Sequence, residues 1–194
     1  MEFRKVFDTI PEQFDKYRPR YSAELFTDLI EYAEIGPGKS VLELGPGTGQ
    51  ATDPILNTGC DYNAIELGEH LFEMMNRKYG QYPNFSIVND DFITYDFENQ
   101  KFDLIYSAAT IQWIPEDVAF AKTFELLKPG GTLAMMLIPA DEYVAYCGTH
   151  CDHIVIPEPY RSKFFSGLRE AVLEAGNKIV FNETFVLFLA KKPA

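Results

Sequence analysis

The stretch Val41-Leu42-Glu43-Leu44-Gly45-Pro46-Gly47-Thr48-Gly49 decides the fold that this sequence predicts. Its first part is an apolar run with β-strand character, and the run ends in glycines at every second position. Residues 50–56 are then compatible with a helix. A strand that passes through a glycine-rich turn into a helix makes a ligand pocket, because glycine permits positive φ and a close approach to the backbone. The unpaired N–H groups at the start of such a helix favour a carboxylate or another anion.

The spacing of the glycines indicates which kind of cofactor the pocket would take. A dinucleotide fingerprint reads G-x-G-x-x-G, whereas here the third glycine comes one residue early and Gln50 takes the sixth position. An acidic residue, Glu43, stands two positions before Gly45. Residues 61–65 predict a second strand that ends at Glu66, about 20 residues after the first glycine, where a carboxylate can accept both hydroxyls of a ribose. A nicotinamide-binding domain is the less favoured alternative.

With this E-x-G-x-G-x-G pattern the chain resembles the class I S-adenosylmethionine (SAM) methyltransferases. The resemblance extends to Phe-Asp-Leu-Ile-Tyr-Ser at 102–107, which is similar to the fourth strand of that family, and to Leu-Leu-Lys-Pro-Gly-Gly at 126–131, which is similar to its turn into the fifth strand. Residues 14–21 and 112–115 resemble a narrower group, the trans-aconitate-like and ubiquinone-biosynthesis-like small-molecule methyltransferases. The segment after the fifth strand, residues 139–161, is shorter than is common in that group.

Composition and charge limit the class of protein. With 194 residues, 46% of them hydrophobic, we expect residues 1–194 to form one domain with a sizeable core. The formal net charge of −12 disfavours nucleic acid as a partner. No apolar stretch is long enough to span a bilayer, the N-terminus lacks the apolar centre of a signal peptide, and three cysteines at uneven spacing do not suggest disulfides. We therefore expect a cytoplasmic protein with a small-molecule partner, without nucleic acid or membrane partners.

Strand and helix patterns alternate along the chain, which predicts an α/β fold with a Rossmann-like, doubly wound, mainly parallel sheet. A C-terminal antiparallel hairpin is expected over 178–181 and 185–190, because these two runs are close in sequence. Residues 1–35 are expected to form an N-terminal helical cover, and 139–160 a short substrate-side segment. The expected strands are 41–44, 61–65, 85–88, 102–106 and 132–138. A helix is expected over 22–34, before the glycine turn, with Ser22 as its N-cap. Beyond the helix that follows the turn, the expected helices are 69–79, 116–127 and 162–175.

The resemblance implies roles for individual residues in holding SAM. Glu66 would take the ribose, Asp91 the adenine amino group with Phe92 over the ring, and Arg18 the carboxylate. The structural alternatives are an exposed strand end for Glu66, an Asx turn at Asp91 and a solvated basic turn at Arg18. Glu43 would either hold the loop or contact the methionine end of SAM. The full set of predicted cofactor-binding residues is Tyr17, Arg18, Glu43, Gly45, Pro46, Gly47, Gly49, Glu66, Leu67, Asp91, Phe92 and Ser107.

The acceptor side is expected beyond the fourth strand, at the carboxyl edge of the sheet. Its predicted residues are Gln112, Trp113, Tyr143 and Tyr146. His150 and His153 are weak candidates for a general base, with ordinary loop histidines as the alternative. Together with Cys147 and Cys151 these histidines match no usual zinc spacing, so no metal is predicted.

The resulting hypothesis is SAM-dependent methyl transfer to a small-molecule acceptor by in-line displacement. The protein would mainly position and desolvate the nucleophile, because the methyl group of SAM is already activated. The alternative hypothesis is a SAM-binding protein without turnover that acts as an interaction or regulatory module. The short segment after the fifth strand motivates this alternative.

Overall fold

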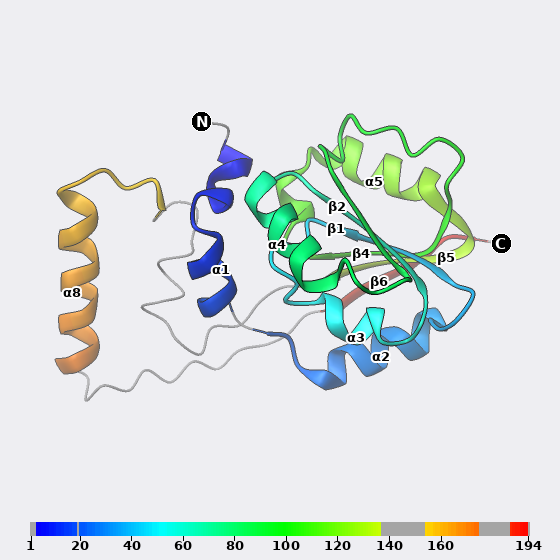
Figure 1. Cartoon of the computed structure of the whole chain (residues 1–194), viewed down its shortest axis with the longest axis horizontal. Coiled ribbons are helices and arrows are strands. Elements are labelled where there is room, and N and C mark those ends of the chain that lie inside the picture. The colour runs from blue at the N-terminus through cyan, green and yellow to red at the C-terminus, as the bar shows by residue number, and fades with distance from the viewer. Residues whose placement is uncertain (1–2, 19, 137–153, 175–186, 194) are drawn as a thin grey trace.

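A six-stranded sheet of order β3-β2-β1-β4-β5-β6 forms the centre of the computed structural model, which describes residues 3–18, 20–136, 154–174 and 187–193 (Figure 1). Neighbouring strands are parallel except for β5 and β6, which are antiparallel. The strands are β1 (Ser40–Leu44), β2 (Asp61–Glu66), β3 (Phe85–Asn89), β4 (Phe102–Ala108), β5 (Leu127–Met136) and β6 (Leu187–Lys191).

Helices cover both faces of the sheet (Figure 1). On one face, α2, α3 and α4 pack with Val41, Tyr62 and Tyr106, and on the other α5 packs with Leu42 and Ile105. Adjacent residues of a strand thus enter different cores, which explains why the central strands read as continuous apolar runs. The helices are η1 (Phe3–Thr9), α1 (Pro11–Tyr17), α2 (Ala23–Ala33), α3 (Thr52–Leu56), α4 (Glu69–Tyr79), η2 (Ile111–Trp113), α5 (Glu116–Leu126) and α8 (Tyr160–Glu174).

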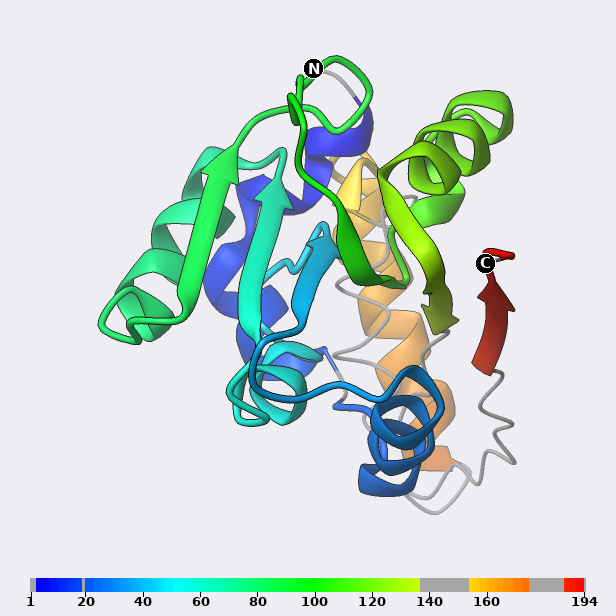
Figure 2. The ribbon, with the colours of Figure 1, turned by 90° about the vertical axis from the view of Figure 1, so that its right-hand side faces the viewer.

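The strand order places the ligand site. The chain runs from β1 outward through β2 to β3 and then crosses to β4 on the other side of β1. Ligands of doubly wound sheets bind beyond the carboxyl ends of the strands at this reversal. Figure 2 shows that the arrowheads of β2 and β3 point to the end of the molecule where the N-terminal segment begins. Residues that directly follow β1, β2, β3 and β4 therefore meet beneath this segment.

The predicted α/β fold with its mainly parallel sheet is confirmed. The helix α4 has the predicted bounds, and the Ser22 hydroxyl caps α2 by accepting from the Leu25 N–H at 3.4 Å. The predicted helix after the glycine turn begins later, at Thr52, because the turn continues through Gly49 with φ +90°.

An antiparallel C-terminal strand is confirmed, because β6 pairs antiparallel with β5. The hairpin predicted between 178–181 and 185–190 stays a prediction, because residues 178–181 lie outside the described residues. The fifth strand was predicted to begin at Thr132 but begins at Leu127, directly after α5. The reason is tertiary: Gly130 N–H donates to the Lys192 carbonyl at 3.0 Å and Lys192 N–H donates to that of Gly131 at 2.9 Å. No helix among the described residues is long and apolar enough to cross a bilayer.

We predict that Leu29→Ala in α2 lowers the free energy of unfolding by about 2–5 kcal/mol, the range for a leucine truncated in a packed core. Leu29 is fully buried between α2 and the sheet. Urea unfolding monitored by circular dichroism measures the change. The control is Glu31→Ala on the exposed side of the same helix, which should alter stability by less than about 0.5 kcal/mol. Equal effects of the two substitutions would contradict the described packing.

Candidate functional site

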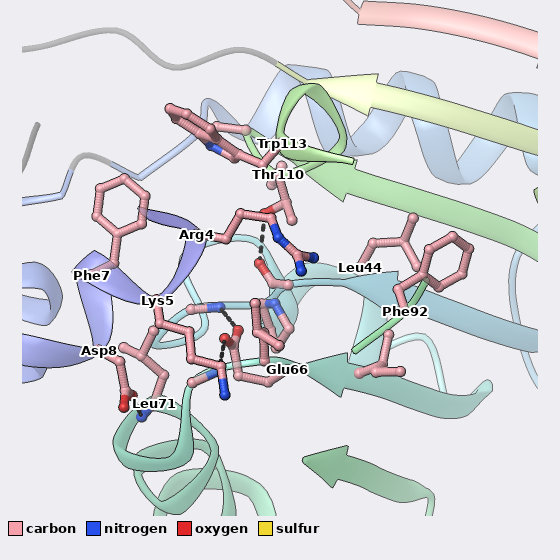
Figure 3. A pocket seen from close by; sticks show the side chains of 18 of the residues that line it. Arg4, Lys5, Phe7, Asp8, Leu44, Glu66, Leu71, Phe92, Thr110 and Trp113 are labelled. Atoms are coloured by element: carbon pink, nitrogen blue, oxygen red, sulfur yellow. Dashed lines mark hydrogen bonds between the residues drawn. The ribbon is translucent and has the colours of Figure 1, made fainter. Parts of the chain in front are cut away.

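A cavity of about 290 Å³ lies at the carboxyl ends of the central strands (Figure 3). Its floor is made by the loops that follow β1, β2, β3 and β4, and η1 and α1 form its cover. This volume is at the lower end of the range for small-molecule sites. The site is therefore built from residues that are far apart in sequence and meet only because of the strand order.

The glycine loop after β1 depends on conformations that other residues avoid. Gly45, Gly47 and Gly49 have φ of +59°, +61° and +90°. A Cβ on Gly45 would lie 2.4 Å from Thr110 Cγ2, and one on Gly47 would lie 2.8 Å from Phe14 Cε1. The glycines thus serve two purposes: they permit the turn, and they let side chains from the β4 loop and from α1 pack directly on it.

We predict that Gly47→Ala loosens the N-terminal segment, because the new Cβ would push against Phe14 while the residue is held at positive φ. Left-handed backbone costs an alanine about 1–2 kcal/mol. Hydrogen exchange should become faster at residues 11–17, measured by mass spectrometry. Gly36→Ala is the control, since a Cβ there meets nothing within 4 Å. Unchanged exchange at 11–17 in the Gly47→Ala variant would show that Phe14 does not rest on this loop.

Glu66, at the end of β2, is 5% exposed and forms part of the cavity wall. Its carboxylate accepts the N–H of Gly47 at 3.0 Å and the N–H of Gly68 at 2.9 Å (Figure 3). Burial raises the pKa of this carboxyl from 4.5 to about 7, although both backbone hydrogen bonds act in the opposite direction. One carboxylate therefore ties the glycine loop to the β2–α4 turn, and at neutral pH it exchanges between its charged and protonated forms.

Glu43 is fully buried beneath the glycine loop and is not among the residues that line the cavity. Its Oε2 accepts from the Thr52 hydroxyl at 2.7 Å and from the hydroxyl of Tyr62, which also contacts the hydroxyl of Tyr106. Burial raises the pKa of Glu43 from 4.5 to about 7. This network fixes the start of α3 to β1, β2 and β4. The sequence left two roles open for Glu43, holding the loop or contacting the cofactor. Its position behind the loop favours the first of these roles.

The raised pKa of Glu43 predicts a pH dependence of stability. The folded carboxyl stays protonated up to about pH 7, whereas the unfolded one ionises near pH 4.5. Between these values the folded state binds more protons, so stability falls as pH rises, by at most about 1.4 kcal/mol per pH unit for each such group. Glu66 contributes in the same window, so we expect Glu43→Gln to halve the slope between pH 5 and pH 7. Chemical unfolding at a series of pH values tests this. Glu31→Gln is the control, and an equal slope in all three proteins would be inconsistent with a protonated Glu43.

The N-terminal segment is fastened to α4 by side chains that the sequence analysis did not identify. The N-cap of α4 is Gly68, which has no side chain, and Asp8 from η1 supplies the missing acceptor to the Leu71 N–H at 2.9 Å. Asp8 also lies 2.9 Å from Nδ1 of His70. A Cβ on Gly68 would come within 2.6 Å of Asp8 Oδ1. This position thus needs glycine so that the carboxylate of another element can reach the start of the helix.

Further polar contacts join the second half of this segment to the glycine loop. Asp15 pairs with Lys78, whose ammonium also donates to the Thr48 carbonyl at 2.8 Å. The guanidinium of Arg20 donates to the Gly49 carbonyl at 2.8 Å. The cover and the loop therefore share hydrogen bonds, and a movement of one disturbs the other.

At the far end of the cavity Asp91 is held by Arg4 of η1. The two guanidinium nitrogens lie 3.0 and 2.7 Å from the two carboxylate oxygens, and Oδ1 also accepts the Ile93 N–H at 3.0 Å. Arg4 is the main reason that the pKa of Asp91 is lowered. The Asx turn that the sequence offered as the structural alternative is thus present, together with an ion pair that it did not predict. The neighbouring Phe92 is 5% exposed and lines the cavity.

Aromatic rings form the upper wall of the cavity. The Phe7 ring lies edge-on to Phe14 at 5.6 Å and to Trp113 at 6.2 Å, between ring centroids. The Arg18 guanidinium stands 5.3 Å from the Phe7 ring and 4.9 Å from the Phe14 ring. Such contacts favour a cation that is partly removed from water. The predicted Arg18 therefore lies at the cavity, stacked within the cover.

The structure brings together most of the predicted site residues that it describes. The predicted residues that line the cavity are Arg18, Gly45, Pro46, Gly47, Glu66, Leu67, Asp91, Phe92, Gln112 and Trp113. Four further predicted site residues are described by the structure but do not line the cavity, namely Tyr17, Glu43, Gly49 and Ser107. The buried Ser107 hydroxyl accepts from the Ile111 N–H at 2.8 Å. Tyr143, Tyr146, His150 and His153 lie outside the described residues. Their functional roles stay predictions.

Several lining residues were not predicted, namely Arg4, Lys5, Phe7, Asp8, Phe14 and Thr110. Five of these belong to η1 and α1. The four in η1 lie in a stretch without a recognisable motif, whereas Phe14 lies in the 14–21 motif but was not assigned to the site. Their places follow from how the segment folds back over the sheet edge. Within the described part of the chain, no cluster of three or more His, Cys, Asp or Glu side chains could hold a metal ion.

Comparison with known proteins agrees with this geometry. Residues 41–131 match the family model of the methyltransferase domain. Ribosomal RNA small subunit methyltransferase A of Clostridium acetobutylicum is 32% identical over 95 residues, which are 44% of this chain and 34% of that protein. An uncharacterised methyltransferase-like protein of Schizosaccharomyces pombe is 23% identical over 143 residues, which are 73% of this chain and 55% of that protein. The chain thus covers about a third of the length of the first of these relatives.

Solved structures resemble the chain in fold. Phosphoethanolamine N-methyltransferase 2 of Haemonchus contortus, in complex with phosphomonomethylethanolamine and S-adenosylhomocysteine, superposes with a TM-score of 0.67 at 15% identity, over 100% of this chain and 61% of the other. The CcbJ methyltransferase of Streptomyces caelestis superposes with a TM-score of 0.60 at 23% identity, over 70% of this chain and 58% of the other. At these identities the likeness concerns the fold alone.

Proposed function

We propose that this chain, which belongs to the class I SAM-dependent methyltransferases through its methyltransferase domain at residues 41–131, transfers a methyl group from SAM to a small-molecule acceptor. The observation that carries the proposal is Glu66. It is a buried carboxylate at the end of β2, bonded to the N–H of Gly47 and facing a covered cavity at the point where the strand order reverses.

The residues of the cavity fit the chemistry of SAM. Acids at the sheet edge suit a ligand that carries hydroxyl and amine donors and a positive charge, and the buried Phe92 offers a flat apolar wall for a base. We assign the ribose to Glu66 and the adenine end to Asp91 and Phe92. The carboxylate of the cofactor would lie at the glycine loop, near Arg18. When bound, SAM supplies a methyl group on a sulfonium, whose carbon–sulfur electrons go to sulfur as the acceptor's electron pair bonds to the carbon.

The chain itself would position the two reactants and exclude water from the site. Phe7 of the cover packs against Trp113 of η2 over the cavity, and these rings would exclude water from the acceptor. Glu66 and the glycine loop fix one reactant, and the loop after β4 with Gln112 and Trp113 faces the other. Holding two reactants in line can account for a large share of such a rate enhancement. This assignment needs no general base among the described residues unless the acceptor must lose a proton.

A small acceptor fits the charge of the chain. The net charge of −12 opposes a phosphate backbone. The ribosomal RNA methyltransferases among the relatives make an RNA acceptor the competing assignment, and their similarity spans only the shared domain. A SAM-binding module without turnover is the second alternative.

The deciding experiment uses the single tryptophan as a probe. Trp113 lines the cavity, so S-adenosylhomocysteine should change its fluorescence and bind with one site per chain by calorimetry. Incubation with methyl-labelled SAM and a metabolite extract or ribosomal RNA then assigns the acceptor by mass spectrometry. A labelled small molecule supports the proposal, whereas labelled RNA favours the competing assignment. Binding without any labelled product favours the module, and no binding contradicts all three.

We predict that cofactor affinity depends on the ionisation of Glu66. Ribose hydroxyls donate to the charged carboxylate, so binding releases the proton that this group retains up to about pH 7. Affinity for S-adenosylhomocysteine should therefore rise from pH 6 to pH 8 and then level off. Glu66→Gln should bind about 10-fold more weakly at pH 8, as expected for a lost charged acceptor, and show little pH dependence. Asp61→Asn, at the exposed start of the same strand, is the control. A pH dependence in the Glu66→Gln variant that parallels the parent would remove Glu66 from the ribose site.

A further inference from the structure

The loop that follows β3 is held from behind by a lysine of α5. The ammonium of Lys122 donates to the Tyr95 carbonyl at 2.6 Å and to the Ile93 carbonyl at 3.3 Å. It also stands over two aromatic rings, 5.2 Å from the centroid of Phe92 and 5.6 Å from that of Phe97. One side chain of α5 thus contacts four residues of a loop that belongs to the other half of the sheet.

The same loop presents a ring to the cavity. Among the residues that Lys122 contacts, Phe92 is the one that also lines the cavity (Figure 3). Phe92 is 5% exposed, and its ring centroid lies 5.9 Å from that of Phe97. Lys122 itself is not on the lining. Any effect of Lys122 on a ligand must therefore pass through Phe92 and its loop.

The loop is fixed on two sides. The Asp91 carboxylate accepts the Ile93 N–H at 3.0 Å, and the Asp91 carbonyl accepts the Tyr95 N–H at 2.8 Å. Asp91 thus takes the N–H groups of the same two residues whose carbonyls accept from Lys122. Phe92 lies between Asp91 and Ile93 in the chain, so its backbone is held by both sets of hydrogen bonds.

The lysine suits this task because of its charge. Burial lowers the pKa of Lys122, and the charges of Asp96, Asp91 and Asp90 act in the opposite direction. A cation that is partly removed from water is accommodated by carbonyl oxygens and by the faces of aromatic rings. Hydrogen bonds from a charged donor are also stronger than those between neutral groups. A neutral apolar side chain of the same length would pack there but would not hold the loop.

We propose that Lys122 is a positioning residue for the adenine end of the cofactor, because it holds the loop after β3 with the Phe92 ring at the cavity before the ligand arrives. The inference rests on the proposed function, which places adenine against Phe92. A loop that is already in its binding conformation need not be ordered by the ligand. A loop that samples other conformations lowers the apparent affinity in proportion to the fraction that is competent to bind.

The first experiment measures cofactor affinity by calorimetry with S-adenosylhomocysteine. Lys122→Met keeps the length of the side chain and removes its charge and donors, whereas Lys122→Arg keeps both. The control is Lys101→Met, because Lys101 is an exposed lysine off the cavity lining that also donates to a carbonyl, that of Glu125, at 2.8 Å. Lys122→Met should bind about 10-fold more weakly than the parent, and Lys122→Arg should stay within about 3-fold of it. Lys101→Met should match the parent.

The second experiment separates the adenine end from the rest of the ligand. S-ribosylhomocysteine has the ribose and the amino acid of S-adenosylhomocysteine but lacks the adenine. Its affinity is measured by ligand-observed nuclear magnetic resonance. Lys122→Met should bind it within about 2-fold of the parent, because its expected contacts are at Glu66 and the glycine loop, away from Phe92. A residue that only stabilises the fold would change both affinities in the same proportion.

A double-mutant cycle tests the path through Phe92. In a Phe92→Leu background, Lys122→Met should weaken S-adenosylhomocysteine binding by less than about 3-fold, because the ring that Lys122 positions is already absent. Circular dichroism checks the fold of each variant. If Lys122→Met does not fold, Lys122→Gln takes its place in both experiments and in the cycle, with the same expected pattern.

The outcomes separate the positioning role from the proposed function. Three results overturn the role of Lys122: no loss of S-adenosylhomocysteine affinity on its substitution, an equal loss for the two ligands, or full additivity with Phe92→Leu. A loss in Lys122→Arg as large as that in Lys122→Met overturns the part assigned to charge. In each of these cases S-adenosylhomocysteine binding by the parent still supports the proposed function. A parent that does not bind S-adenosylhomocysteine overturns both.

Discussion

The site depends on one carboxylate that accepts two backbone N–H groups. Glu66 joins Gly47 of the glycine loop to Gly68 at the start of α4, and all three are fixed at the end where β1 and β2 leave the sheet. Burying the charged carboxylate costs free energy, which is why the pKa of Glu66 rises to about 7. The hydrogen bonds from the two backbone N–H groups offset part of this cost. Removing this acceptor would leave two buried donors unsatisfied and free the loop that defines the cavity.

The cover depends on the same turn. Gly68 lacks a side chain, so Asp8 of η1 can approach and cap α4 in its place. Asp15 and Arg20 then bond to Lys78 and to the Gly49 carbonyl, which joins the far end of the cover to the glycine loop. The floor and the cover are thus one hydrogen-bonded system, and a ligand that alters the loop also alters the segment above it.

Charge within the site is balanced between elements rather than within them. The acidic surface of the chain would repel an anionic ligand, and the three cations of the cavity lining, Arg4, Lys5 and Arg18, all come from the N-terminal segment. Glu43 contributes differently, because its network with Thr52, Tyr62 and Tyr106 lies behind the loop and stabilises it from the protein interior. Two buried acids of similar pKa thus differ in position: Glu66 lines the cavity, and Glu43 lies in the scaffold behind the loop.

The sequence by itself determined the sheet, the glycine loop and the position of Glu66, because these follow from local patterns: apolar runs, glycines that must take positive φ, and an acid at a strand end. It also predicted Ser22 as a cap and the bounds of α4. Only the tertiary structure decided that Arg4 holds Asp91, that Asp8 caps a helix about sixty residues away, and that β5 begins at Leu127. These contacts join distant segments, and their partners are chosen by the folding of the whole chain, which no local spacing encodes.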